Sequence, residues 1–221
     1  MPRPNWLNRQ RLLQTAAVLA DGVVHAMDLG YTHLAGGNGR YWLLWAGAGA
    51  DGWLVDQIEP RPRWSKKLGA LGYVLQGLMV AYKLPRMHAS VEVDGRFYDG
   101  EQLMVLASNC RLYAGGEVVL SPQARLDDGL FEVWLLGGRG LSAVLRYMWQ
   151  MYRGVHMRQP SVQMVNGRYV YIEATPAIQV QTDGEKAGFT PLRVEIKPKA
   201  LRLLVPSTAP KDLFTSSGEP L

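Results

Sequence analysis

The strongest constraint on the fold is the alternation of apolar and polar residues through most of the chain after residue 86. Runs such as "HASVEVDGRFYDGEQLMVLASN", "SVQMVNGRYVYIEA" and "LRVEIKPKALRLLVP" have the period of two that half-buried strands require. Asp94-Gly95, Asn166-Gly167 and Asp183-Gly184 fall between such runs, where hairpin turns are expected. With one helix from Leu141 to about Tyr152, the pattern predicts an antiparallel β-sandwich with two or three inserted or flanking helices. This is an α+β fold that is mainly β.

The first part of the chain adds helices and a hairpin. From Asn5 to Asp21 apolar residues recur at helical spacing, and Gly22 gives a stop signal before the strand "VVHAMDLGYTHL". The glycine-rich run Gly36 to Gly39 predicts a hairpin turn into a second strand, "YWLLWAG". A further helix is predicted from Trp64 to Lys83, because leucines repeat there at steps of three and four before Pro85.

Composition and charge narrow the function classes only partly. The chain has 221 residues, of which 48% are hydrophobic, as in an ordinary globular protein. The longest apolar-rich run, Leu68 to Tyr82, is shorter than the roughly 20 residues needed to span a bilayer, and no secretory signal is evident. A cytoplasmic location is therefore expected. A net charge of +5 leaves nucleic acid and anionic lipid open as partners, and the basic cluster Arg61 to Lys67 equally suits a solvated loop.

The segment "GAGADG", Gly47 to Gly52, matches the glycine pattern of dinucleotide-binding proteins. Such a unit also needs a helix that opens at the last glycine and a second parallel strand. The sequence "WLVDQIEPRPRW" instead contains two prolines, and hairpin patterning follows. We therefore expect neither that helix nor a dinucleotide site here.

Two groups of carboxylates are candidate sites. Asp127 and Asp128 precede a glycine, where one carboxylate and nearby backbone carbonyls could bind Mg²⁺ or Ca²⁺, although an ordinary turn explains the same residues. The triplet Asp-Gly-Glu occurs twice, at 99–101 and at 183–185. An aspartate beside an extended loop could accept the proton of a substrate hydroxyl. The local sequence does not decide which triplet has that role.

The order of motifs along the chain resembles one family. The segments "MDLGYTHL", "YWLLWAGAGADG", "VLASNCRLYAGGEVVLSPQARLDDGLFEVWLL" and "VQTDGEKAGFTPLRVEIKPKALRLLVP" occur in this order between about residues 22 and 206. Together they resemble the C-terminal β-sandwich domain of bacterial lipid kinases of the diacylglycerol kinase catalytic-domain family, which are relatives of sphingosine and ceramide kinases. The resemblance implies a phosphoryl transfer from ATP to a lipid hydroxyl.

The resemblance also implies roles for particular residues. It makes Asp183 the general base that takes the proton of the lipid hydroxyl, with Glu185 beside it in an electrostatic or metal-binding role. The triplet that begins at Asp99 is then a hairpin turn without catalytic function. The D-D-G segment resembles the family's structural Mg²⁺ site, which implies Asp128 as the carboxylate ligand and the backbone carbonyls of Arg125 and Leu130 as its neighbours.

The chain departs from the family pattern in one respect. Family members begin with a nucleotide-binding domain that carries a G-G-D-G-T signature and a later G-T-x-N stretch, and neither string occurs here. We expect residues 1–21 to be a helical segment that follows such a domain, residues 22–206 to form the β-sandwich domain, and residues 207–221 to be a loose tail. Without the nucleotide-binding domain the chain is expected to transfer no phosphoryl group.

Two functions remain open on these grounds. In one, the chain supplies the lipid-binding and base residues to a nucleotide-binding domain in the same or another polypeptide, with Mg²⁺ as cofactor and ATP as co-substrate. In the other, it is a non-catalytic lipid-binding or regulatory module. Both imply a lipid partner rather than nucleic acid. The basic cluster Arg61 to Lys67 and the helix after it favour peripheral attachment to an anionic membrane surface.

Overall fold

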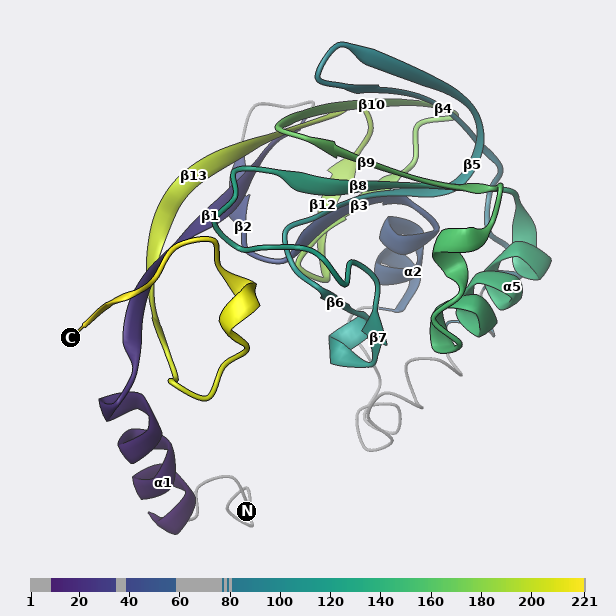
Figure 1. Cartoon of the computed structure of the whole chain (residues 1–221). Helices are drawn as coiled ribbons and strands as arrows, with labels where there is room; N and C mark the ends of the chain where they lie inside the picture. Colours follow the sequence, from purple (N-terminus) through teal and green to yellow (C-terminus); the bar gives the residue numbers. More distant parts are fainter. Residues whose placement is uncertain (1–8, 35–38, 59–76, 78, 80, 221) are drawn as a thin grey trace.

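The computed structural model describes residues 9–34, 39–58, 77, 79 and 81–220 (Figure 1). The described helices are α1 (Arg9–Ala20), α2 (Ala50–Ile58) and α5 (Gly140–Tyr152), with short 3-10 turns at Ala114–Gly116, His156–Arg158 and Lys211–Leu213. The described strands are β1 (Val23–Leu34), β2 (Arg40–Trp42), β3 (Trp45–Gly49), β4 (Met87–Val93), β5 (Arg96–Ser108), β6 (Leu112–Tyr113), β7 (Val118–Val119), β8 (Phe131–Gly137), β9 (Val162–Gly167), β10 (Tyr169–Thr175), β11 (Gln179–Thr182), β12 (Glu185–Phe189), β13 (Leu192–Val205) and β14 (Glu219–Pro220).

Most of the strands belong to one large sheet that curls around a core. Its order is β12-β11-β3-β5-β4-β10-β13-β1-β14, with β2 beside β1, β8 beside β5 and β9 beside β8. Every pairing between described strands is antiparallel. The long strand β5 makes the curl possible because its first half pairs with β4 and its second half with β3 and β8. The predicted α+β class, mainly antiparallel β, is confirmed.

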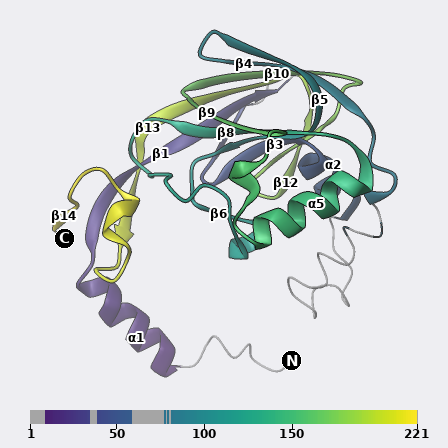
Figure 2. The ribbon, with the colours of Figure 1, turned by 45° about the vertical axis from the view of Figure 1, so that its right-hand side comes forward.

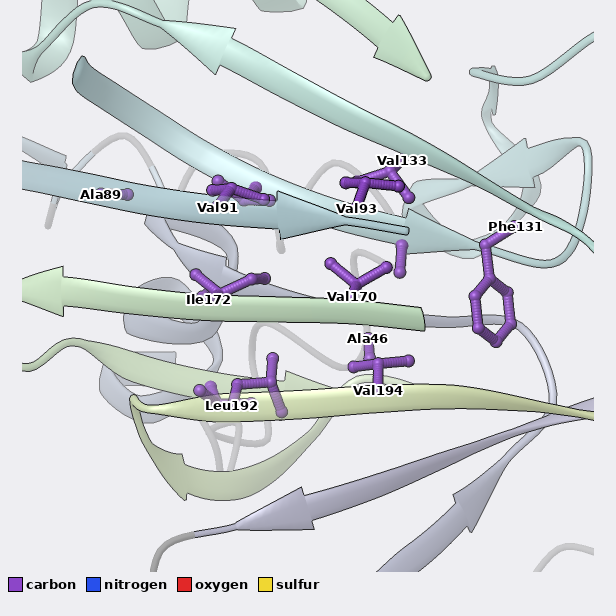
Figure 3. Close-up of a cluster of buried hydrophobic side chains, with 14 of the residues drawn as sticks. Ala46, Ala89, Val91, Val93, Phe131, Val133, Val170, Ile172, Leu192 and Val194 are labelled. Carbon is purple, nitrogen blue, oxygen red and sulfur yellow. The ribbon is translucent and has the colours of Figure 1, made fainter. Parts of the chain in front are cut away.

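The inner face of the curled sheet buries the main hydrophobic core. Residues of β3, β4, β5, β8, β10, β11 and β13 contribute to it. Figure 3 shows part of this cluster on neighbouring strands: Val91 and Val93 on β4, Val170 and Ile172 on β10, and Leu192 and Val194 on β13. Complete burial of such a side chain stabilises the fold by about 1.5–3 kcal/mol, so the period-two pattern of these strands is the main determinant of the fold.

A second apolar cluster lies on the outer face of β5 and β8. Val105 and Val133 point into the main core, whereas Leu106 and Trp134 point outward into the second cluster. α5 covers this outer face and contributes Ala143 and Tyr147 to the cluster. These parts of β5 and β8 are therefore buried on both faces, which explains why they are apolar throughout rather than alternating.

Several elements agree with the sequence predictions. α1, β1 and α5 lie within a few residues of the predicted boundaries, and the pairing of β1 with β2 confirms the predicted hairpin. The predicted hairpin turn itself, the basic cluster Arg61 to Lys67 and most of the predicted helix Trp64 to Lys83 lie outside the described residues. Within the described part of the chain, no helix is both long and apolar enough to span a bilayer.

Two predicted turns differ from the structure. Asn166-Gly167 is not a turn, because both residues still belong to β9 and pair with β8. Gly167 is required there by packing, since a Cβ at this position would overlap Val93. The triplet that begins at Asp99 is also not a turn. It lies inside β5, where Asp99 is opposite Ser90 of β4, because the turn between the two strands is already made by Asp94-Gly95.

Residues 207–220, which the sequence predicts to be loose, pack against the body of the domain. The ring of Phe214 is buried and stacks on His25 of β1, with centroids 3.9 Å apart. Arg111 forms an ion pair with Asp212 (2.9 Å), and β14 pairs with the start of β1. Figures 1 and 2 show this segment running beside β1 and β13. The sequence does not indicate these contacts, because the segment has no periodicity.

Candidate functional site

Asp183 lies in a tight turn between β11 and β12. Asp183 and Gly184 have positive φ angles of 50° and 80°, as a type I′ hairpin turn requires. The backbone N–H of Asp183 donates to the carbonyl of Trp45 (2.9 Å). Its carboxylate accepts three backbone hydrogen bonds from the bend between β2 and β3. Oδ2 accepts from Leu43 (2.8 Å), and Oδ1 accepts from Leu44 (2.8 Å) and Trp45 (3.2 Å).

The bend at Leu43 and Leu44 interrupts the segment "YWLLWAG", which the sequence predicts as one strand. Its first part pairs with β1 and its second part with β5 and β11, so the chain must change direction between them. Asn109, which is fully buried, holds the carbonyl side of this bend. Its backbone N–H donates to the carbonyl of Leu44 (2.8 Å) and its Nδ2 donates to the carbonyl of Leu43 (3.1 Å).

A second aspartate makes the same kind of contact at the turn between β4 and β5. Asp94 and Gly95 also have positive φ angles, 46° and 81°. Oδ2 and Oδ1 of Asp94 accept from the N–H groups of Arg168 and Tyr169, both at 2.9 Å. An aspartate that opens a type I′ turn can thus hold a neighbouring segment without any chemical function. The backbone contacts of Asp183 explain its place in the fold, and a catalytic role needs separate support.

Glu185 is the first residue of β12 and lies opposite Thr182 across the turn. Its exposed carboxylate forms an ion pair with Arg40 of β2, with 2.7 Å between Oε2 and Nη2. An exposed pair of this kind adds at most about 1 kcal/mol to stability. Its main effect is to orient Glu185 on the same surface as the Asp183 turn.

The other copy of the triplet has different surroundings. Asp99 is exposed on the β4–β5 pair, where it accepts hydrogen bonds from the hydroxyl of Ser90 (2.5 Å) and from Nε2 of His88 (2.9 Å). These two hydrogen bonds lower the pKa of Asp99. Asp99 therefore makes only local cross-strand contacts, in contrast to Asp183, which contacts a segment about 140 residues away.

A buried polar network supports the Asp183 turn from inside. The N–H of Gly184 donates to Oε1 of Gln181 (2.7 Å), and Nε2 of Gln181 donates to the carboxylate of Asp51. The hydroxyl of Tyr113 donates to the other oxygen of Asp51 (2.5 Å). Burial raises the pKa of Asp51 above its ordinary value, although both hydrogen bonds act in the opposite direction.

Close packing around this network explains the glycines of "GAGADG". α2 does begin directly after β3, so the expectation that no helix opens there was wrong. β3, however, has antiparallel neighbours on both sides, unlike the parallel strands of a dinucleotide-binding unit. A Cβ at Gly47 would lie 2.5 Å from Oδ2 of Asp51, and one at Gly52 would overlap the carbonyl oxygen of Gln179. These glycines allow α2 to pack against β3 and β11.

The two carboxylates of the D-D-G loop (Asp127 to Gly129) have different surroundings. Asp127 is buried and holds the C-terminal segment, accepting from the N–H groups of Thr215 (2.5 Å) and Ser216 (3.1 Å) and from the hydroxyl of Ser216 (2.7 Å). Asp128 accepts one backbone hydrogen bond, from Leu130 (3.0 Å), and lines an open pocket. Asp128 therefore retains the greater capacity to bind an added ligand.

The pocket beside Asp128 has a volume of about 190 Å³. Its lining includes Ser121, Pro122, Gln123, Arg125, Asp128, Glu132, Trp134, Met157, Met164 and Asn166. Glu132 is a buried carboxylate on β8; burial, followed by the charge of Asp128, raises its pKa to about 7. The sequence did not indicate Glu132, because a single glutamate in "LFEVWLL" has the pattern of an outward-facing strand position.

The donor chemistry of the D-D-G loop is suitable for Mg²⁺. Burial raises the pKa of Asp128, and the charges of Asp28 and Asp127 raise it further, so a cation would relieve a concentration of negative charge. Within the described residues no three His, Cys, Asp or Glu side chains are arranged as metal ligands. An ion at this loop would therefore depend on Asp128 together with backbone oxygens such as those of Arg125 and Leu130.

Hydrogen bonds connect the D-D-G loop with the bend that Asp183 holds. Oδ2 of the fully buried Asp28 accepts from the N–H of Gly129 (2.6 Å). The carbonyl of Asp28 accepts from Nδ2 of Asn109 (2.9 Å), the same group that donates to Leu43. Since Leu43 also donates to Asp183, a continuous path joins the two candidate sites.

The thiol of Cys110 provides further support for this proximity. Burial raises its pKa to about 11, and the charges of both Asp183 and Glu132 contribute in the same direction. The Asp183 turn and the pocket beside Asp128 therefore lie close enough to act electrostatically on one side chain. The sequence predicted the two sites separately, and the fold brings them into one region.

Comparison with known proteins identifies the family. The model of the YegS C-terminal NAD kinase beta sandwich-like domain matches residues 46–205. The diacylglycerol kinase of Bacillus subtilis (strain 168) is 26% identical over 183 residues, which cover 83% of this chain and 58% of the relative. That of Staphylococcus carnosus (strain TM300) is 25% identical over 182 residues, covering 81% and 56%. The chain therefore spans just over half the length of these relatives.

Solved structures agree at the level of the fold. The crystal structure of a diacylglycerol kinase from Bacillus anthracis str. Sterne superposes with a TM-score of 0.53 at 17% identity, covering 87% of this chain and 56% of that chain. A second crystal structure from the same strain gives a TM-score of 0.66 at 18% identity, covering 90% and 64%. This chain belongs to the YegS C-terminal domain family, and the resemblance to the C-terminal domain of diacylglycerol-kinase-like proteins is confirmed.

Proposed function

We propose that the chain provides the lipid-side domain of an ATP-dependent kinase that phosphorylates a lipid hydroxyl, of the diacylglycerol or sphingosine type. One observation carries the proposal. The carboxylate of Asp183 is fixed in one orientation beside Leu43 and Leu44, whose side chains are partly exposed. A basic oxygen next to accessible apolar side chains suits a substrate that presents a hydroxyl beside hydrocarbon. Family membership supports the same reading, because the curated relatives are named diacylglycerol kinases.

In this proposal Asp183 accepts the proton of the lipid hydroxyl. Oδ1 already accepts two backbone N–H groups and Oδ2 accepts one, so Oδ2 has a lone pair available for the substrate. The three hydrogen bonds fix the carboxylate before the substrate arrives, which avoids an ordering cost during the reaction. Glu185, oriented by Arg40, contributes negative charge at the edge of the same surface.

The phosphates of ATP would be held by a nucleotide-binding domain in the same or another polypeptide. Phosphoryl transfer depends on positioned, metal-bound phosphates as well as a base, and this sequence contains neither the G-G-D-G-T nor the G-T-x-N string. We therefore propose that residues 22–206 alone transfer no phosphoryl group. Mg²⁺ at the D-D-G loop would be held by Asp128 and by the carbonyls of Arg125 and Leu130, where its charge would stabilise the loop.

A second candidate is a lipid-binding module without catalysis. The observation that favours it is the parallel between the turns at Asp183 and Asp94, since both aspartates hold backbone in the same way. If Asp183 had only this structural role, the domain could bind lipid and perform no chemistry. The two candidates differ in one measurable quantity, the transfer of phosphate to lipid.

The experiment joins the chain, as a fusion and as a mixture, to the part of the Bacillus subtilis diacylglycerol kinase that lies outside its match to this chain. Transfer of labelled phosphate from Mg-ATP to diacylglycerol and to sphingosine is then measured in mixed micelles. We expect transfer to at least one lipid, and none from the chain alone. Lipid binding without transfer in either format would favour the non-catalytic module, and transfer by the isolated chain would contradict the assignment of ATP binding to another domain.

A further inference from the structure

The outward face of α5 is apolar, which is the reverse of an ordinary surface helix. The side chains that α5 buries include Ala143, Tyr147 and Gln150. Four large side chains at spacing i, i+3, i+4 and i+7 point to solvent instead. These are Leu145 (46% exposed), Met148 (38%), Trp149 (58%) and Tyr152 (85%). At 3.6 residues per turn they form one continuous stripe on the outside of the helix.

The buried side of α5 has its own contacts, so the outward stripe is not needed to hold the helix. The hydroxyl of Tyr147 donates to the carbonyl of Gly137 (2.6 Å) and lies 2.9 Å from the hydroxyl oxygen of Ser161. Ala143 and Tyr147 pack into the second apolar cluster. The four exposed side chains therefore remain available to a partner.

The charge around α5 indicates the nature of that partner. Residues 133–167 contain four arginines and no aspartate or glutamate, whereas the rest of the chain carries twenty basic and nineteen acidic residues. This segment thus accounts for four of the five net positive charges. Arg146 and Arg153, at the flank of the stripe, are exposed. Their guanidinium groups lie over the rings of Tyr147 and Trp149, at 5.0 and 5.5 Å, and no described carboxylate pairs with them.

We propose that α5 is the element with which this domain docks onto an anionic membrane surface. Leu145, Met148, Trp149 and Tyr152 would enter the boundary between headgroups and acyl chains, and Arg146 and Arg153 would contact the anionic headgroups. An interfacial helix needs aromatic and apolar side chains on one face and arginines at the edge of that face. A protein partner would require complementary acidic groups, and anionic lipid supplies them over a flat area.

This surface belongs to α5, whereas the Asp183 turn contacts the bend between β2 and β3. Figures 1 and 2 show α5 on the outside of the sheet, away from β1 and β13. The proposal extends the proposed function, since a lipid substrate would be reached from such a surface. The membrane-docking proposal can nevertheless fail while the proposed kinase function holds, because binding to vesicles is measured without ATP and without turnover.

The test is sedimentation of the full chain with sucrose-loaded vesicles. Wild type should bind vesicles that contain phosphatidylglycerol, bind weakly to pure phosphatidylcholine, and lose the difference as salt is raised. The variant Arg146→Gln/Arg153→Gln should lower partitioning about thirtyfold at low salt, because each arginine near an anionic surface contributes roughly a fivefold change. Trp149→Gln/Tyr152→Gln should lower it at least about tenfold on both kinds of vesicle.

Matched controls come from the opposite end of the sheet. Arg96→Gln/Arg168→Gln removes the same charge, and Phe97→Gln removes an aromatic ring that is 78% exposed on the β4–β5 hairpin. These variants should bind like wild type. Equal losses in the controls and the α5 variants, or equal binding to neutral and anionic vesicles, would overturn the proposal. So would sedimentation velocity that shows a wild-type dimer and a monomeric Trp149→Gln/Tyr152→Gln variant, since the stripe would then join two copies of the chain.

Discussion

Replacing Asp183 by asparagine removes one negative charge and converts one carboxylate oxygen into an amide group with two N–H donors. The asparagine oxygen can still accept from Leu44 and Trp45, as Oδ1 does. The new amide then faces the N–H of Leu43, which Oδ2 accepts at 2.8 Å, so two donors oppose each other. The substitution therefore perturbs the bend between β2 and β3 even if Asp183 has no chemical role.

The expected loss of stability follows from these contacts. Hydrogen bonds to a charged group contribute roughly 1.5–3 kcal/mol when buried, and solvent reduces this value at a partly exposed turn. We expect Asp183→Asn to lower the free energy of unfolding by about 1–2 kcal/mol, or roughly 2–8 °C in melting temperature for a domain of this size. Asp94→Asn should have a similar effect, because Asp94 occupies the same turn position and holds two N–H groups.

Activity separates the two aspartates. A general base contributes about 10²–10⁴-fold to a rate, so Asp183→Asn should lower phosphate transfer at least about a hundredfold when the chain is joined to a nucleotide-binding domain. The assay is run well below both melting temperatures, with circular dichroism to confirm that each variant is folded. Asp94→Asn should retain nearly full transfer despite its similar loss of stability.

Asp99→Asn provides the second control, because it alters the identical triplet inside β5. Its side chain contacts only its cross-strand neighbours, so transfer and melting temperature should both stay close to those of wild type. If Asp183→Asn and Asp94→Asn lose transfer equally, the loss reflects the turns rather than a base. If Asp183→Asn keeps full transfer, the proposed catalytic role is wrong.

Three further outcomes are expected. Mg²⁺ should raise the melting temperature of wild type and of the control Asp21→Ala, but not of Asp128→Ala, since a ligand that binds only the folded state stabilises it; an equal rise in all three would place the ion elsewhere. Because the pKa of Asp51 is raised in the folded state, its contribution to stability falls as pH increases above about 4. The melting temperature of Asp51→Asn should therefore rise relative to that of wild type as the pH is increased, and a pH-independent difference between the two would contradict this. Cys110, with its pKa raised to about 11, should react with a thiol reagent at pH 8 about a hundredfold more slowly in the native protein than in urea, and equal rates would show that the thiol is not protected.

Local pattern was sufficient to predict much of the fold. Strands of the main core, such as β4 and β10, alternate inward and outward residues and therefore have a clear period of two. Asp94-Gly95 and Asp183-Gly184 were predicted as turns because glycine and aspartate tolerate positive φ. The predicted helix from Leu141 to about Tyr152 is confirmed as α5. The pattern could not show which of its faces is outward, since that depends on the sheet behind it.

Other features depend on pairings that no local pattern contains. "YWLLWAG" is divided between two strands because its halves have different partners. The two Asp-Gly-Glu triplets are locally identical, yet one is in a strand because the turn at Asp94 precedes it by five residues. Phe214 is buried against His25 through a segment without periodicity. In each case the outcome depends on residues distant in sequence, which periodicity does not report.

The residues of the candidate site were also only partly predictable from the local sequence. The sequence alone marked Asp128 and both Asp-Gly-Glu triplets as candidates, but only the resemblance to a family assigned roles to Asp183, Glu185 and Asp128. The groups that position them, including Asn109 and the backbone of the bend, were not indicated at all. Such groups are difficult to predict because each contacts main-chain atoms of a distant segment that only the fold brings near. Glu132 was missed for a related reason, since it lines a pocket together with Met164 and Asn166 of β9, which only the fold brings beside it.

Asp28 shows why the two candidate sites cannot vary independently. It lies at a register shift between β1 and β13, where Oδ1 accepts from the N–H of Lys199 (2.7 Å), a residue with a positive φ of 52°. Oδ2 accepts from Gly129 of the D-D-G loop, and the carbonyl of Asp28 accepts from Asn109, which holds the bend in contact with Asp183. One buried residue thus fixes the sheet irregularity, the candidate metal loop and the segment that orients the candidate base. Because a buried carboxylate cannot lose one of these partners without leaving polar groups unpaired, the relative positions of Asp128 and Asp183 are set by the fold rather than by either loop.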